Sequence, residues 1–185
     1  MPFGALLAEY SSTGWVHAVA FSPSGCQLTW CSHDSTLAVV NKAMAMCAGD
    51  QPILCRTVGL PFRTLCWMGE NRIIAAGYDC SPVLFSVDVE EGTRKPVLAM
   101  LSKLGVPAPE DHTNANVGNV FRMFRNTDRT ANAEESTSGQ LKTLHQNAIT
   151  EVQIHTGRPD NVTKFSTCGT DGLVAIWDLK VKMKI

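Results

Sequence analysis

The sequence has almost no excess of charge of either sign, because its 16 lysines and arginines nearly balance its 17 aspartates and glutamates. A chain without a field of one sign has no global attraction for nucleic acid or for an anionic membrane. Long apolar runs are also missing, since none approaches the ~18 residues of a membrane span. The first residues, MPFGALLAEY, lack the basic flank of a secretory signal. These absences favour a soluble globular protein with no nucleic-acid partner and no membrane insertion.

Patterns that carry catalysis or metal binding are missing as well. The seven cysteines include no Cys-x-x-Cys pair, and no histidine follows them at a zinc-finger distance. The sequence has no phosphate-binding glycine loop and no paired carboxylates, so we expect no cofactor, no metal and no enzymatic activity. Most cysteines lie in apolar runs, where cysteine behaves as a small hydrophobic residue. We therefore expect reduced, buried thiols in a cytosolic protein.

What the sequence does contain is an aspartate that recurs in three similar segments. These segments are SHDST around Asp34, AAGYDCSPVLF around Asp79 and TCGTDGLVAIWD around Asp171. Asp34 and Asp79 lie 45 residues apart, which matches the ~40–45-residue period of a four-stranded propeller blade. The third segment ends in Trp177-Asp178, the dipeptide after which WD repeats are named. The pattern predicts an all-β fold of the WD-repeat β-propeller type.

The repeats divide the chain into three expected blades and one insertion. The blades are predicted at about residues 10–50, 51–92 and 141–181, with residues 43–47 able to form the fourth strand of the first. Because Asp79 and Asp171 lie 92 residues apart, either one blade is degenerate or a blade carries a long insertion. Residues 93–140 do not read as strands, which favours the insertion.

The third repeat also carries a candidate polar network. His145 precedes Trp177 by 32 residues, and Thr167 and Asp171 lie between them, as in the hydrogen-bond network of WD blades. A buried aspartate needs paired partners, and an imidazole, a hydroxyl and an indole N–H supply them. A histidine and an aspartate together could also belong to a catalytic triad. The blade spacing explains both residues and no nucleophile elbow is present, so we predict a structural role. The other four histidines lack ligand spacing and are expected at the surface or in turns: His17, His33, His112 and His155.

The insertion contains one candidate helix, at residues 120–129, with Asn119 as a plausible N-cap. Its apolar residues would gather along one side, and its arginines would lie toward the other faces. The apolar set is Val120, Phe121, Met123 and Phe124, and the arginines are Arg122, Arg125 and Arg129. So short a helix is marginal in water unless something buries its aromatic rings. Either the helix folds back onto the blades, or it is an exposed anchor for a partner groove.

Five segments together resemble one family: MPFGALLAEYSSTGWVH, SHDST, AAGYDCSPVLF, MFRNTDRTA and LHQNAIT. The family is that of the WD-repeat propeller subunit of the actin-related protein 2/3 complex. The resemblance implies a seven-bladed propeller within a cytoplasmic complex that nucleates branched actin filaments. It further implies that the inserted helix contacts the mother filament and that nucleation-promoting factors engage the complex nearby. The implied actin-contacting residues are Phe121, Arg122, Met123, Phe124, Arg125 and Arg129.

Seven blades of ~42 residues need roughly 300 residues. The chain is therefore expected to represent about three C-terminal blades, with Met1 an internal methionine of a longer protein. An isolated arc exposes blade edges, so we expect it to be marginally stable alone.

The expected function is that of a non-enzymatic scaffold subunit of this complex, associated with the actin cytoskeleton. One alternative is a generic WD-repeat adaptor of another assembly, with an incidental helix packed on its blades. A second alternative is a truncated product without activity of its own.

Overall fold

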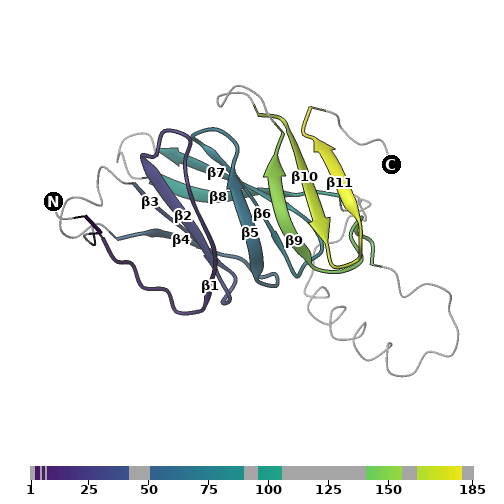
Figure 1. Ribbon diagram of the computed structural model, residues 1–185, viewed down its shortest axis with the longest axis horizontal. Helices are drawn as coiled ribbons and strands as arrows, with labels where there is room; N and C mark the ends of the chain where they lie inside the picture. The colour runs from purple at the N-terminus through teal and green to yellow at the C-terminus, as the bar shows by residue number, and fades with distance from the viewer. Residues whose placement is uncertain are drawn as a thin grey trace, which may run out of the picture.

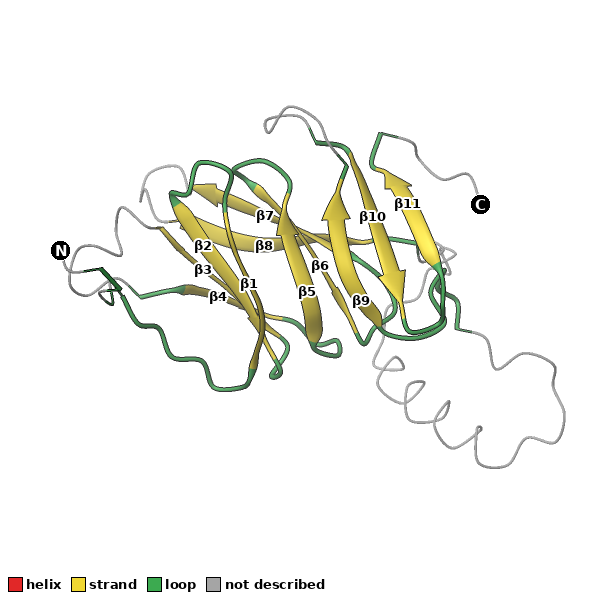
Figure 2. Cartoon of the chain, viewed as in Figure 1, coloured by secondary structure: helices red, strands yellow, loops and turns green. Residues whose placement is uncertain are grey.

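The structure, a computed structural model, describes residues 3–4, 6, 8–41, 51–89, 96–105, 141–155 and 162–180. Within these ranges the chain is all-β, with eleven strands and no helix (Figures 1 and 2). In the same part of the chain, no helix is long and apolar enough to cross a membrane.

The strands form three antiparallel sheets in chain order (Figure 1). Sheet A contains β1 (Val16–Phe21), β2 (Gln27–Ser32), β3 (Thr36–Asn41) and β4 (Ile53–Arg56). Sheet B contains β5 (Phe62–Trp67), β6 (Arg72–Gly77), β7 (Val83–Val89) and β8 (Pro96–Lys103). Sheet C contains β9 (Ile149–Ile154), β10 (Lys164–Gly169) and β11 (Val174–Asp178). Each is a meander in which strands that follow one another along the chain pair antiparallel, as the sequence predicted.

The hydrophobic core lies between the sheets. A first apolar cluster joins Leu37 and Val39 of sheet A to Phe62 and Phe85 of sheet B, whose rings meet edge to face. A second cluster joins sheet B to sheet C, where Phe165 and Trp177 stack at 5.8 Å between ring centroids. Sheet B is therefore buried on both of its faces. Aromatic and branched side chains pack against both faces of sheet B, and the residues of β6 are therefore fully buried in an unbroken run.

The three repeated aspartates occupy the same place in each sheet, the turn between the second and third strands. The residue after each one has a left-handed backbone, with φ of 63° at Ser35, 59° at Cys80 and 77° at Gly172. Only the third turn places glycine there, the residue that adopts this conformation at no steric cost. The recurrence of the aspartate in the sequence thus corresponds to a recurring backbone conformation at these turns.

Two blade boundaries differ from those expected. The fourth strand of sheet A begins at Ile53, beyond the expected boundary at residue 50, and pairs with β3. The alternative at residues 43–47 lies outside the described residues. The insertion expected from residue 93 starts too early, because β8 pairs with β7 as the outer strand of sheet B. Both outer strands have one face exposed to solvent, which weakens the hydrophobic signal by which strands are recognised.

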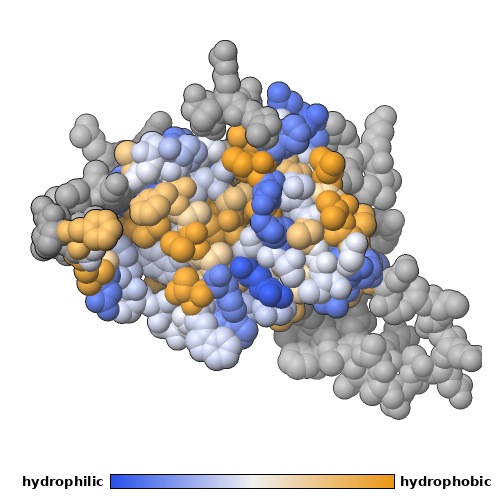
Figure 3. Space-filling view, viewed as in Figure 1, coloured by the Kyte–Doolittle hydropathy of each residue, from blue (hydrophilic) through white to orange (hydrophobic). Residues whose placement is uncertain are grey.

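Apolar side chains remain exposed on several strands, including Val19 and Phe21 of β1 and Ile176 of β11. In Figure 3, hydrophobic atoms gather over the part of the face where Figure 1 draws β1 and β2. The six cysteines of the described residues are free, and only Cys31 and Cys80 among them are buried. Burial raises the pKa of the Cys31 and Cys66 thiols to about 12.

Candidate functional site

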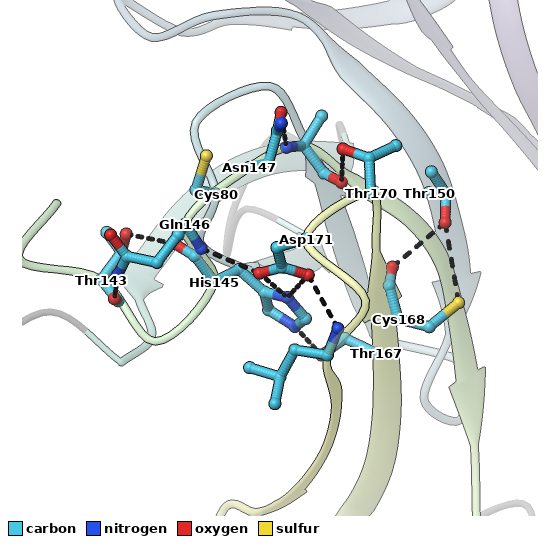
Figure 4. A network of polar contacts seen from close by, with 12 residues as sticks. Cys80, Thr143, His145, Gln146, Asn147, Thr150, Thr167, Cys168, Thr170 and Asp171 are labelled. Atoms are coloured by element: carbon cyan, nitrogen blue, oxygen red, sulfur yellow. Dashed lines mark hydrogen bonds and ion pairs between the residues drawn. The ribbon is translucent and has the colours of Figure 1, made fainter. Parts of the chain in front are cut away.

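The structure brings the four predicted network residues of sheet C into one chain of hydrogen bonds. The fully buried His145 has its Nδ1 atom 3.0 Å from Asp171 Oδ2 and its Nε2 atom 2.8 Å from Thr167 Oγ1. Trp177 Nε1 donates to the same hydroxyl oxygen at 2.9 Å. Figure 4 shows the imidazole lying between the carboxylate and Thr167. Residues from the segment before β9, from β10, from the following turn and from β11 are thereby tied together.

The bonding capacity of each group determines the direction of these bonds. An indole N–H only donates, so Thr167 Oγ1 accepts from Trp177 and is free to donate its own proton to His145 Nε2. The remaining imidazole proton then sits on Nδ1 and points at the Asp171 carboxylate. In this arrangement every group is satisfied and all bonds run one way, which strengthens each of them.

Asp171 also holds the backbone on both sides of the turn. Its carboxylate accepts from the N–H of Gln146 at 2.8 Å and from the N–H of Leu173 at 3.0 Å. Desolvation by burial acts to raise the pKa of Asp171. The hydrogen bonds from Leu173, Gln146 and His145 outweigh it, so that the pKa lies below its ordinary value. The charged carboxylate thus fixes the segment that leads into β9.

The equivalent aspartates of sheets A and B make the same connection with different partners. Asp79 accepts from the N–H of Leu60, just before β5, at 3.0 Å, and pairs with Lys103 Nζ at 3.0 Å. Asp34 accepts from the hydroxyl of Thr13, just before β1, and this bond is the main cause of its lowered pKa. In all three sheets the turn aspartate therefore holds the chain that enters the first strand.

Polar contacts also link one sheet to the next. The backbone N–H and the hydroxyl of Ser24 donate to the two carboxylate oxygens of Glu70 at 2.6 and 2.7 Å, joining a turn of sheet A to a turn of sheet B. Trp67 Nε1 of sheet B donates to the carbonyl of Ala20 at 3.1 Å. The N–H of Val152 in sheet C donates to Thr64 Oγ1 at 3.3 Å. These contacts fix the sheets relative to one another, as a rigid platform requires.

An aromatic cluster at the junction of sheets A and B was not expected from the sequence. His17 Nε2 lies 2.8 Å from His33 Nδ1, Trp15 packs beside His33, and Tyr78 of sheet B meets His33 edge-on. Arg63 lies over the Tyr78 ring at 5.6 Å. Burial, then the charges of His33 and Arg63, lower the pKa of His17. The hairpin spacing of His17 and His33 was the available signal, because it places them side by side at one end of neighbouring strands.

The six residues predicted to contact actin lie outside the described residues: Phe121, Arg122, Met123, Phe124, Arg125 and Arg129. In the described part of the chain, no three His, Cys, Asp or Glu side chains gather as they would around a metal ion. The polar contacts found in the described part of the chain fix turns and hold the sheets in place.

Comparison with known proteins gives a consistent set of relatives. The chain is 43% identical over 183 residues to actin-related protein 2/3 complex subunit 1A-B of Xenopus laevis, covering 97% of this chain and 46% of the relative. It is 35% identical to subunit 1 of Schizosaccharomyces pombe, over 97% of this chain and 49% of that protein. Subunit 1 of Saccharomyces cerevisiae is 26% identical over 96% of the chain and 47% of its own length. The chain is a homologue of subunit 1 of the actin-related protein 2/3 complex.

The three sheets of this subunit 1 homologue accordingly form part of a WD-repeat β-propeller, as the sequence predicted. No family model matches the chain. The chain spans about half the length of the curated relatives it matches.

Proposed function

We propose that the chain serves as part of a non-enzymatic scaffold, subunit 1 of the actin-related protein 2/3 complex. The observation that carries this proposal is the likeness to subunit 1 proteins along nearly the whole chain. The architecture suits the role, since three sheets locked by buried aromatic clusters and by the Ser24–Glu70 contact hold a fixed shape. The partners are then the other subunits, the actin filament and nucleation-promoting factors, in the cytoplasmic actin cytoskeleton.

The mechanism we propose is positional. The rigid sheets hold neighbouring subunits in place, and residues 120–129 form the amphipathic helix that meets the mother filament. Aromatic side chains dominate interface hot spots, so Phe124 is proposed as the main anchor. Phe121 and Met123 would extend the apolar contact, while Arg122, Arg125 and Arg129 would face an acidic surface.

Reconstitution tests both parts of the proposal. The chain would be co-expressed with the other subunits of the complex in place of subunit 1, and branch density would be counted by fluorescence microscopy of growing filaments. The proposal expects an assembled complex that forms branches. Failure of the folded chain to enter the complex would contradict the scaffold role.

The anchor is tested in the same assay with Phe124→Ala. We expect normal assembly and a branch density at least ~5-fold lower, since truncating an energetically important interface aromatic costs more than about 1 kcal/mol of binding free energy. Phe3→Ala is the matched control, because Phe3 is fully exposed and lies in another part of the chain. Equal branching by Phe124→Ala and Phe3→Ala would reject the anchor while leaving the scaffold role standing.

A further inference from the structure

A hollow lies between sheets B and C, at the end of the molecule where β5 ends and β10 begins (Figure 1). Its volume is about 390 Å³, within the range of roughly 300–1,000 Å³ that is typical of ligand-binding pockets. The β5–β6 turn, residues 68–72, forms one wall, and Val162 and Thr163 form the other. We call this hollow the Arg72 hollow. Both of its walls come from described sheets that pack on one another in the second cluster.

Backbone hydrogen bonds hold both walls of the Arg72 hollow in place. The N–H of Met68 donates to the carbonyl of Arg72 at 2.8 Å and closes the turn. The N–H of Val87 in β7 donates to the carbonyl of Asn71 at 2.9 Å. On the other wall, the carbonyl of Thr163 accepts at 2.9 Å from the backbone N–H one residue past β11. Walls that are already fixed lose little conformational entropy when a ligand binds between them.

Arg72 supplies the positive charge of the hollow. The residue is exposed, and the ion pairs within the described part of the chain involve other cations, namely Lys103, His145 and Lys164. Glu70 is the second charged residue of the wall, but both of its carboxylate oxygens already accept hydrogen bonds from Ser24 of sheet A. The hollow thus contains a guanidinium that no described carboxylate pairs with, and a carboxylate that is bonded elsewhere.

A buried hydroxyl on the strand next to Arg72 also lacks a partner. The register of β6 and β7 aligns Arg72 with Ser86 and Ile74 with Leu84. Ile74 and Leu84 pack against sheet C in the second cluster, and the side-chain period of two places Arg72 and Ser86 on the same face. Ser86 is 7% exposed, and its Oγ atom has no hydrogen-bond partner in the described part of the chain. Such a group calls for an explanation, and a polar ligand beside it is one.

We propose that the Arg72 hollow binds a small carboxylic acid in its ionised form. The planar guanidinium of Arg72 matches a carboxylate through two parallel hydrogen bonds. The Asn71 amide and the Thr163 hydroxyl supply further donors from the two walls. Val162 and Met68 offer apolar contacts to the carbon chain that carries the carboxylate. The site goes beyond the proposed function and does not rest on it, because it needs only sheets B and C.

The charge balance of the hollow favours a ligand with one negative charge over a ligand with two. A phosphate monoester carries close to two negative charges at neutral pH. The hollow offers one guanidinium and also holds the Glu70 carboxylate, so a second negative charge would lack a cation and would be repelled. The expected ligand is therefore a monocarboxylate with a short apolar chain. A ligand this small is expected to bind with a Kd of roughly 1–10 mM.

Titration of the isotope-labelled chain with butyrate, followed by two-dimensional amide NMR, tests the proposal. The dispersion of the amide signals shows in the same spectra that the chain is folded. We expect saturable shifts of the Gly69, Asn71 and Thr163 amide signals up to about 50 mM butyrate, at an ionic strength held constant to remove general screening effects. Butyramide has nearly the same shape without the charge, and inorganic phosphate carries more charge. Both are expected to bind at least ~10-fold more weakly than butyrate.

Variants of the exposed arginine make the test specific. Arg72→Gln should weaken butyrate binding at least ~10-fold, and Arg72→Lys should retain only part of the affinity, because lysine keeps the charge without the planar fork. Arg56→Gln is the matched control, since Arg56 is an exposed arginine of β4 in sheet A. Equal affinities for butyrate and butyramide, or an unchanged affinity in Arg72→Gln, would overturn the proposal. So would tighter binding of an acetylated glutamate peptide than of butyrate, which would assign the hollow to a contact with another polypeptide.

Discussion

His145 Nδ1 and the Asp171 carboxylate lie 3.0 Å apart although 26 residues separate them in the sequence. The contact joins the segment that leads into β9 to the turn between β10 and β11. It closes sheet C in the way that Asp79 and Leu60 close sheet B and Asp34 and Thr13 close sheet A. The stability of each sheet is thus expected to depend on a few polar contacts at its turn.

Thr167→Val should destabilise the chain by about 1–3 kcal/mol, because it leaves the Trp177 indole N–H and His145 Nε2 without their buried partner. Urea denaturation followed by tryptophan fluorescence measures the change. Thr150→Val is the control, since that half-buried hydroxyl makes only longer contacts, 3.2 Å to the Cys168 carbonyl and 3.6 Å to Cys168 Sγ. Equal losses of stability for the two variants would show that the buried network adds nothing beyond such ordinary contacts.

The Asp171 carboxylate should make stability depend on pH in the acid range. Its pKa is lower in the folded chain than the ordinary 3.8, so the folded state favours the charged form. The stabilisation is complete above the unfolded pKa and is lost as the pH falls through the folded pKa. Unfolding free energies of the wild type and Asp171→Asn, measured between pH 5 and 2.5, should therefore converge at low pH. Parallel curves would contradict the assignment.

His17 should add a second pH dependence of stability, in which the folded state favours the neutral form of the side chain and not the charged form. Its lowered pKa means that the folded state favours the neutral imidazole, which burial and the neighbouring His33 and Arg63 favour over the cation. The contribution to stability is complete above pH 6.5 and declines as the pH falls below it. His17→Gln should flatten this step in melting temperature, and His155→Gln, at an exposed ring, should keep it. A step in melting temperature that persists in His17→Gln would show that a different titratable group causes it.

Gly172 should tolerate asparagine better than alanine. Nothing lies within 4 Å of an added Cβ there, so the cost comes from the backbone φ of 77°. Gly172→Ala should cost about 1–2 kcal/mol, and Gly172→Asn should cost about half as much, because asparagine adopts the left-handed region more readily. Thermal melts compare the two. Identical melting temperatures for the two variants would show that the preference for glycine at this position does not come from its backbone conformation.

The sequence was sufficient for the features that depend on short-range geometry. The recurrence of Asp34, Asp79 and Asp171 located three equivalent turns, and the spacing from His145 to Trp177 brought the four network residues into a single hypothesis. Each of these features lies within one sheet. A local pattern in the sequence was therefore enough to predict them.

Features that depend on the packing of one sheet against another were not predictable. The Ser24–Glu70 contact spans 46 residues, and the His33–Tyr78 contact crosses between two sheets. Neither pair follows from strand periodicity, because it depends on how far one sheet is rotated against the next. The outer strands β4 and β8 were misplaced for a related reason, since each has only one packed face.

The most direct test of the proposed function is quantitative co-purification of the affinity-tagged chain from cells that contain the actin-related protein 2/3 complex. Mass spectrometry would give the molar ratio of both actin-related proteins to the chain. We predict that both actin-related proteins are recovered, each at a molar ratio near one to the chain that has entered the complex. A folded chain, verified by circular dichroism, that brings down neither protein while native subunit 1 brings down both would contradict it.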